Sequence, residues 1–310
     1  FWLPTTYMAG AAPVAAMFAI MTKVGIYVIL RLTMLLFGPT AGASAGFGSD
    51  LLIAAGMATV AFGLLGVLAS QGLGRMAAHL VLISSGTLLT VNGLVLAGGG
   101  EKLLAGGMFY LVSSVVATSA LFLLLEPMSR EEGGIAAMLA LTADAYGLDD
   151  PEDDGAPEVG LAIPGTLTVL GLAFGGCLLA LAGLPPLSGF IGKVAILSAA
   201  LGSANLAPGL VWSLIALLLV AGLATLIGLI RIGIQTFWAA EGTVPKVLAV
   251  EIAPVVALLG MIGLMTIEAQ DTLRYMESAA SALHRPTIYS AGVFEAARSE
   301  GILPAPETTE

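Results

Sequence analysis

Long uninterrupted runs of apolar residues constrain this chain more than any other feature of its sequence. Several runs hold about 20 or more apolar positions, the length at which an α-helix crosses roughly 30 Å of hydrocarbon. The runs are continuous rather than alternating, and in lipid each segment must pair its own backbone groups, so they predict helices. Charged residues make up 10% of the chain, against about 25% in soluble domains. The sequence therefore predicts an all-α polytopic membrane protein.

Loop signals divide the apolar sequence into seven expected membrane-spanning regions. Stretches rich in glycine or charge, such as GPTAGASAGFGSD, QGLGR and GGGEK, separate the first four regions. Residues 1–125 hold spans one to four, residues 161–267 hold spans five to seven, and residues 268–310 form a polar tail that starts with an amphipathic pattern. The expected spans are Ala11–Phe37, Leu51–Ser70, Met76–Ala97, Leu103–Leu125, Leu161–Leu201, Leu210–Phe237 and Val247–Ile267.

A block of acidic residues separates the fourth and fifth spans. Ten of the 21 acidic residues fall between Glu126 and Glu158, with Arg130 as the only base. Such like-charge blocks are typical of solvated loops, so residues 126–160 are expected to lie in water. The positive-inside rule places this loop in the cytoplasm. Four basic residues in the connections between spans fall on the loop's side, Arg75, Arg130, Arg231 and Lys246, and Lys102 falls on the other. Three arginines of the tail, Arg274, Arg285 and Arg298, also fall on the side opposite the loop and weigh against this orientation.

The sequence begins FWLPTTYMAG, without an initiator methionine, a basic leader or a cleavage site. The letters WLP are typical of the end of a loop that another segment precedes. We therefore expect the C-terminal part of a longer chain. The sequence also contains no nucleotide-binding glycine loop, metal-ligand cluster or nucleophile–base arrangement, so we expect no cofactor, no metal and no nucleic-acid partner.

Lys23 lies near the middle of the first expected span, within AAMFAIMTKVGIYVILRL. A lysine close to a helix end can extend its amine to the interface, but this one is too central to do so easily. Placing it at mid-bilayer costs about 2.5–3.5 kcal/mol. Low dielectric disfavours the charged amine, so a lysine here can take up and release a proton. A snorkelling or ion-paired lysine is the structural alternative.

The stretch LAGLPPLSGFIGKVAIL interrupts the fifth region with a double proline, and Lys193 follows it. Pro185 and Pro186 lack N–H donors and clash with the preceding turn, so carbonyls near Leu181 and Ala182 lose their helical partners. In lipid, freed carbonyls are tolerated only where they face protein or a water-filled cavity. Ser188 and Gly189 can then start a second half-helix. A broken helix beside an ionisable residue is typical of ion sites in transporters.

Other polar residues in the spans have both functional and structural interpretations. His79, in the third span, shares a helical face with Gly86 and Thr90 and is either a proton-passing group or a packing histidine. Glu251 is either an interfacial carboxylate or a proton-entry group. Three hydroxyls in the fourth span either hold water or bond back to their own helix: Ser113, Ser114 and Thr118.

Three stretches resemble one known family of antiporter-like membrane subunits. FWLPTTYMAGAAPVAAMFAIMTKVGIYVILRL resembles the loop and eighth helix of that family, and LAGLPPLSGFIGKVAIL resembles its discontinuous twelfth helix. Proton-pumping subunits of respiratory complex I share both motifs. LRYMESAASALHRPTIYSAGVF resembles the tail found in the D-type subunits of Mrp multisubunit sodium/proton antiporters. The resemblance covers nearly all of the chain.

The resemblance implies a fourteen-helix fold with two inverted five-helix repeats, of which this chain holds helices eight to fourteen. It implies that Lys23 is the central relay lysine and that Lys193 is the lysine at the break of the second repeat. The chain departs from the family in two places. FYLVSS puts Ser113 where a histidine is frequent, and GLGR keeps only Arg75 of a DLKR-like loop.

We therefore expect a proton-translocating subunit of a Na⁺/H⁺ antiporter in the bacterial cytoplasmic membrane, with other subunits and the lipid bilayer as partners. It would be a transporter subunit and not an enzyme. One alternative is the homologous subunit of complex I or of a membrane-bound hydrogenase. A second is a scaffold subunit that carries no protons, and a third is a seven-helix receptor, which the proline-broken fifth span disfavours.

Overall fold

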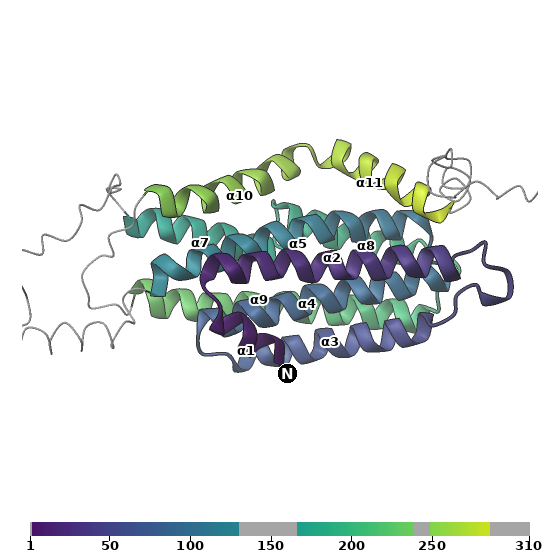
Figure 1. Cartoon of the computed structure of the whole chain (residues 1–310), viewed down its shortest axis with the longest axis horizontal. Coiled ribbons are helices and arrows are strands. Elements are labelled where there is room, and N and C mark those ends of the chain that lie inside the picture. Colours follow the sequence, from purple (N-terminus) through teal and green to yellow (C-terminus); the bar gives the residue numbers. More distant parts are fainter. Residues whose placement is uncertain (1, 130–165, 239–248, 286–310) are drawn as a thin grey trace, which may run out of the picture.

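A computed structural model describes residues 2–129, 166–238 and 249–285, and in these ranges every regular element is helical (Figure 1). The prediction of an all-α polytopic protein is thus confirmed. The elements are α1 (Trp2–Ala9), α2 (Ala12–Phe37), the short η1 (Gly42–Ser44), α3 (Ser49–Ala69), α4 (Leu73–Leu94), the π-helical η2 (Val95–Gly99), α5 (Gly100–Ser129), α7 (Thr166–Ala182), α8 (Ser188–Leu201), α9 (Pro208–Trp238), α10 (Ala249–Ile267) and α11 (Ala269–His284).

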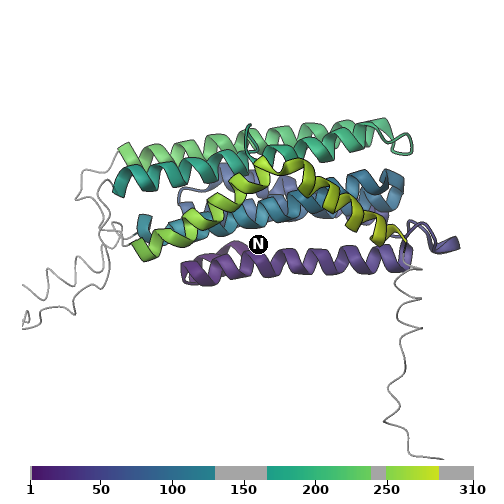
Figure 2. The same ribbon diagram turned by 90° about the horizontal axis from the view of Figure 1, so that it is seen from above.

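The long helices lie side by side along one axis, and α4 forms the centre of the bundle (Figure 1). Almost all residues of α4 are buried, because α3, α5, α2 and α9 pack around it. Helices α10 and α11 cover α5, and Figure 2 shows them crossing the bundle obliquely. Different faces of α4 therefore contact different neighbouring helices.

Helix length and composition agree with repeated membrane crossing. Five helical segments of the described ranges are long and apolar enough to span a bilayer, and α7 and α8 are shorter apolar helices. One of the five segments contains both α4 and α5, which are separated by positive φ angles at Gly98 and Gly100. The five segments are Ala12–Phe37, Gly42–Ala69, Leu73–Met128, Pro208–Phe237 and Val250–Ile267.

Helices α3 and α4 approach each other through glycines. A Cβ atom built on Gly56 would lie 2.4 Å from Oγ1 of Thr90, and one built on Gly86 would lie 2.7 Å from the carbonyl oxygen of Gly56. Gly63 and Gly93 meet the facing helix equally closely. Such contacts let two backbones pack without intervening side chains, as small residues do in membrane bundles. Helices α3 and α4 therefore pack with their backbones in close contact.

One local prediction is wrong: the opening WLP is helical and not the end of a loop. The hydroxyls of Thr5 and Thr6 donate to the carbonyl oxygen of Trp2, which closes the first turn of α1. Pro4 is tolerated because the first turn of a helix does not need its N–H. Tyr7 then anchors α1, because its buried ring packs on Phe122 and its hydroxyl bonds to Thr22.

Several boundaries also differ from the expected ones. Helix α5 continues to Ser129, so the expected end at Leu125 falls inside it. The expected acidic loop at 126–160 lies almost wholly outside the described residues, as do Arg130 and Lys246. Arg231 does lie at the same end of the bundle as Arg75, because its guanidinium donates to carbonyls of Leu68 and Ser70 at the end of α3, near the start of α4.

Candidate functional site

Lys23 reaches from α2 across to α4 and is fully enclosed, with 1% of its surface exposed. Its Nζ donates to Oγ of Ser84 at 2.6 Å, to Oγ of Ser85 at 2.9 Å and to the carbonyl oxygen of Val81 at 3.2 Å. An ammonium has three N–H donors, so three acceptors satisfy it completely. All three acceptors are neutral, and no carboxylate of the described ranges pairs with this amine. Lys23 is thus a buried amine whose three hydrogen-bond acceptors are all neutral.

Ser84 and Ser85 were missed by the sequence analysis. The signal is present, because the two serines stand together inside an otherwise apolar run, VLISSGTLL. What the sequence does not show is that Lys23, about 60 residues earlier, faces this point of α4. Only the packing of α2 on α4 joins them.

The fifth expected region is broken between Ala182 and Ser188, close to the predicted interruption. Helix α7 ends with Gly183 in the left-handed region at φ +75°, and the amides of Gly183 and Leu184 both donate to the carbonyl oxygen of Leu179. The Pro185–Pro186 peptide that follows is cis. Helix α8 starts at Ser188, so α7 and α8 are two half-helices of one interrupted region.

Lys193 returns from α8 to the break and binds the carbonyls at the end of α7. Its Nζ donates to the carbonyl oxygen of Ala182 at 2.8 Å and to that of Leu181 at 3.2 Å. These are groups that an uninterrupted helix would have paired, and an unpaired buried carbonyl costs about 1–3 kcal/mol. Lys193 therefore has two roles open to it here: it caps a broken helix, and it presents an ionisable amine.

Small residues make room for this arrangement. A Cβ atom on Gly189 would lie 1.9 Å from the carbonyl oxygen of Ala180, so the start of α8 touches the α7 backbone directly. A Cβ atom on Gly222 of α9 would lie 2.9 Å from the carbonyl oxygen of Ala182 and 3.7 Å from Nζ of Lys193. The break is thus enclosed by α9 as well as by its own two halves.

Ser113 connects α5 to the break. Its hydroxyl lies 2.8 Å from that of Ser188, the first residue of α8, and both side chains are fully buried. Hydroxyls can donate and accept at once, so this pair can pass a hydrogen bond between the two helices. The residue at the position where the resemblance leads us to expect histidine therefore still contacts the broken helix.

A second pair of hydroxyls links α4 to α5. The buried side chain of Tyr110 interacts with that of Thr87, which lies about one turn along α4 from the serines that hold Lys23 and donates its own hydrogen bond to the carbonyl oxygen of Ile83. Tyr110 also lies against α8, because a Cβ atom on Gly192 would be 3.0 Å from its Cα. Neither Thr87 nor Tyr110 was singled out from the sequence. The tyrosine of FYLVSS was the available signal, since a Tyr hydroxyl in a buried span needs a partner.

His79 does not join the lysines. It lies between α3 and α4, where its Nδ1 is 2.8 Å from the carbonyl oxygen of Arg75. A Cβ atom on Gly66 would lie 1.9 Å from the imidazole ring, so that glycine leaves the space which the ring occupies. The face of α4 that carries His79, Gly86 and Thr90 is the face packed against α3. Lys23 meets a different face of the same helix.

The other two predicted hydroxyls of α5 have partners other than the lysines. The hydroxyl of Ser114 donates to the carbonyl oxygen of Leu111, and that of Thr118 donates to the carbonyl oxygen of Ser114 at 2.7 Å. Both thus bond back to their own helix. Glu251 is half-buried in the first turn of α10.

The polar groups between the two lysines form an interrupted series across the bundle. Lys23 contacts Ser84 and Ser85, Thr87 follows on α4, Tyr110 contacts Thr87, and the Ser113–Ser188 pair reaches the start of α8. Every member except the lysines is a hydroxyl. A hydroxyl can accept a hydrogen bond through its oxygen and donate another through its O–H at the same time. Water would have to bridge the gaps in the series.

Comparison with known proteins gives a consistent result over most of the chain. Residues 1–219 match the profile of a family described as NADH:quinone oxidoreductase/Mrp antiporter, TM. The D-type subunit of a probable K⁺/H⁺ antiporter of Rhizobium meliloti is 51% identical over 305 residues, which cover 96% of this chain and 56% of the relative. The D-type subunit of a Na⁺/H⁺ antiporter of Alkalihalophilus pseudofirmus is 27% identical over 304 residues, which cover 95% of this chain and 54% of that relative.

The fold is also found in a solved assembly. A chain in the structure of the Mrp complex from Dietzia sp. DQ12-45-1b superposes with a TM-score of 0.70 at 22% identity, covering 94% of this chain and 57% of that one. At this identity the similarity concerns the fold alone. The chain spans a little more than half the length of the curated relatives it matches.

Proposed function

Because the chain belongs to the family of membrane subunits shared by NADH:quinone oxidoreductases and Mrp antiporters, we propose that it is a proton-translocating subunit of a multisubunit antiporter that exchanges protons for a monovalent cation. In this proposal it is a transporter subunit and not an enzyme. The observation that carries it is a pair of lysines in apolar helices, one enclosed by neutral acceptors and one at a broken helix.

The identity of the cation, the membrane and the partners is part of the proposal. The relative that is 51% identical is named for K⁺ and the one that is 27% identical is named for Na⁺, so both ions are candidates, Na⁺ being the one predicted from the sequence. Both relatives are called subunits, which supports the presence of partner subunits. The cytoplasmic membrane of a bacterium is the location in which such an exchanger would act.

The proposed route runs laterally from Lys23 to Lys193. A proton leaving Lys23 passes to the hydroxyls at Ser85 and Thr87, crosses to α5 through Tyr110 and reaches α8 through Ser113 and Ser188. Water completes the chain where the hydroxyls do not touch. Lys193 then exchanges its proton with one side of the membrane, and the carbonyls of α7 keep its amine at the break.

The two amines would be coupled by their charges. Two like charges repel more strongly in a low-dielectric interior than in water, so a proton on one lysine makes a second proton on the other less favourable. No carboxylate of the described ranges lies beside Lys23 to cancel this effect. Proton arrival at Lys23 therefore favours release from Lys193.

Exchange in everted membrane vesicles tests the proposal. Respiration acidifies the vesicle interior, and we expect addition of K⁺ or Na⁺ outside to dissipate this ΔpH in vesicles that hold the complete complex. Vesicles lacking the complex serve as the control. A response to K⁺ and not to Na⁺ would make the sodium prediction wrong, and no response to either ion would contradict the proposed function.

The alternatives give different outcomes. A subunit of complex I would copurify with redox subunits, and its proton movement would require a reduced electron donor in place of a cation gradient. A scaffold subunit would leave exchange intact when the lysines or the hydroxyls between them are replaced. Copurification and the exchange rates of such variants therefore separate the three functions.

Replacing Tyr110 with phenylalanine tests the middle of the route. The change removes the Tyr110 hydroxyl, which interacts with Thr87, and keeps the Cα and Cβ atoms that lie against Gly192 of α8. We expect the exchange rate to fall about tenfold, which equals roughly 1.4 kcal/mol in the barrier. Tyr27 is a matched control, because it is an exposed tyrosine on α2 and Tyr27→Phe should keep the wild-type rate. Equal rates in both variants would remove Tyr110 from the route.

A further inference from the structure

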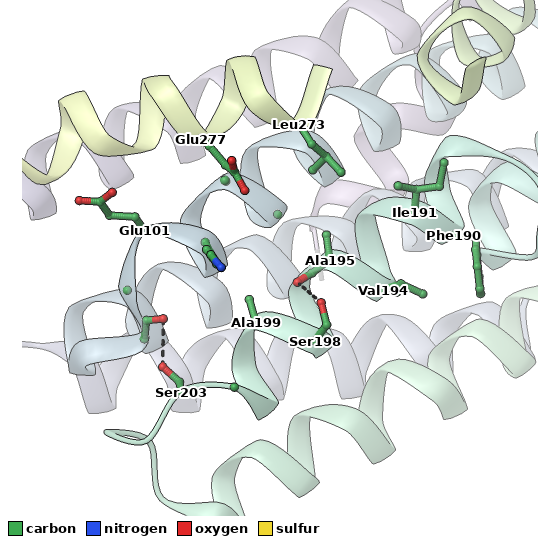
Figure 3. Close-up of a pocket in the computed structure, with 16 residues that line it drawn as sticks. Glu101, Phe190, Ile191, Val194, Ala195, Ser198, Ala199, Ser203, Leu273 and Glu277 are labelled. Atoms are coloured by element: carbon green, nitrogen blue, oxygen red, sulfur yellow. Dashed lines mark hydrogen bonds between the residues drawn. The ribbon is translucent and has the colours of Figure 1, made fainter. Parts of the chain in front are cut away.

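An open groove runs along α8 on the side of the bundle that α11 covers. Its volume is about 730 Å³, and it is bounded by the start of α5, by α8 and by the middle of α11 (Figure 3). Lys193 is not among its lining residues. The groove is therefore separate from the route proposed above.

The length of the groove is close to the thickness of one leaflet of a bilayer. Its lining extends from Phe190, near the break, to Ser203, just beyond the end of α8. Helix α8 has 14 residues and is therefore about 21 Å long. Half of a bilayer's hydrocarbon core is about 15 Å, and the polar headgroup region adds several more ångströms. A half-helix beginning at a mid-membrane break thus covers the depth that one phospholipid occupies.

The end of the groove near the break is apolar. Phe190, Ile191 and Val194 of α8 line it, and Leu273 of α11 faces it from the opposite wall (Figure 3). Val194 is exposed. An acyl chain lying here would cover aliphatic and aromatic surface.

The other end of the groove carries three charges. Glu101 and Lys102 stand in the first turn of α5, and Glu277 extends from α11 toward the groove (Figure 3). All three side chains are exposed, and none forms an ion pair within the described ranges. One cation and two carboxylates at the same end of the groove are complementary to a group that holds a phosphate and a primary ammonium together.

We propose that this groove binds one aminophospholipid, with its phosphate on Lys102, its ammonium on Glu277 and Glu101, and an acyl chain along α8. A primary ammonium has three N–H donors for the two carboxylates, and a choline headgroup has none. A glycerol headgroup brings no positive charge to them. The site therefore selects phosphatidylethanolamine over phosphatidylcholine and phosphatidylglycerol.

A bound lipid would hold α8 and α11 together. The main contacts of α11 are with α5, α2 and α10, and the groove lies between it and α8. The lipid fills this separation and braces the half-helix that carries Lys193. Lipid occupancy would thus support the position of the broken helix without taking part in proton transfer.

Native mass spectrometry of the purified complete complex tests the proposal. The complex is depleted of lipid in detergent and titrated separately with phosphatidylethanolamine, phosphatidylcholine and phosphatidylglycerol of identical acyl chains. We expect the double variant Lys102→Ala/Glu277→Gln to bind phosphatidylethanolamine about tenfold more weakly than the wild type. Ala199→Phe fills the groove without changing its charge and should abolish the same binding event.

Arg274→Gln is the matched control. Arg274 is an exposed charge on the same helix, pairs with Asp271 and does not line the groove, so its loss should leave lipid binding unchanged. Unchanged phosphatidylethanolamine affinity in both groove variants would overturn the proposal. So would equal affinity of the wild type for all three lipids, or efficient disulfide cross-linking of Glu277→Cys to another subunit, since a protein would then occupy the groove.

Discussion

We expect replacement of Lys23 with methionine to abolish cation-driven proton exchange while the complex still assembles. Methionine keeps an unbranched apolar side chain and removes the amine that three acceptors on α4 hold. A proton-transfer group contributes typically 10²–10⁴-fold to a rate, so we expect the exchange rate to fall by about 100-fold or to the vesicle background. Everted vesicles with matched amounts of complex give this rate.

Stability separates this effect from misfolding. Removing a buried charge that only neutral groups contact in the described part of the chain relieves a desolvation cost, and the hydroxyl of Ser84 keeps its own bond to the carbonyl oxygen of Val81. The melting temperature should therefore stay the same or rise. Ser119→Ala is a control at the neighbouring α5–α2 contact, where Ser119 donates to the carbonyl oxygen of Ala16 at 3.3 Å. Wild-type exchange by Lys23→Met would rule out a relay through this lysine.

Two substitutions at Lys193 distinguish its capping role from its proposed proton transfer. Lys193→Met leaves the carbonyls of Leu181 and Ala182 without donors, so we expect a lower melting temperature and an exchange rate reduced about 100-fold. Lys193→Arg supplies donors for both carbonyls but does not release a proton, because a guanidinium stays charged in proteins. It should keep the melting temperature and lose exchange.

The comparison between these two variants decides the role of the residue. If Lys193→Arg exchanged protons at the wild-type rate, the amine would act as a cap for the broken helix and the route would have to end elsewhere. Measuring both variants in the same preparation as Lys23→Met also shows whether the two lysines act in one path. If the two lysines act in series, the double variant Lys23→Met/Lys193→Met should exchange protons no more slowly than the more impaired of the two single variants.

Much of the fold was predictable because a membrane reduces the possible elements to helices. The apolar runs located α2, α3, α9 and α10 to within about three residues, since lipid tolerates few other structures. The break in the fifth region was predictable as well, because Pro185 and Pro186 cannot continue a helix. The expected number of seven spans rests on counting these runs. For the short helices α7 and α8, length alone does not decide whether each crosses the membrane.

The candidate site was only half predictable. A charged residue in an apolar run is recognisable by itself, so Lys23 and Lys193 could be named from the sequence. Their partners could not, because Ser84, Ser85 and the carbonyl oxygen of Ala182 become partners only through tertiary packing. His79 is a different case: the sequence left both proton transfer and packing open, and the structure places its ring against Gly66, between α3 and α4.

The hydroxyls around Lys23 can hydrogen-bond to its amine in both of its protonation states. The charged amine donates three hydrogen bonds, and the neutral amine has two N–H groups and one lone pair. Ser84 already donates to the carbonyl oxygen of Val81, so its oxygen remains an acceptor. The hydroxyl of Ser85 can rotate and donate to that lone pair. A single O–H rotation thus replaces any backbone movement, which gives proton uptake and release at this position a small reorganisation energy.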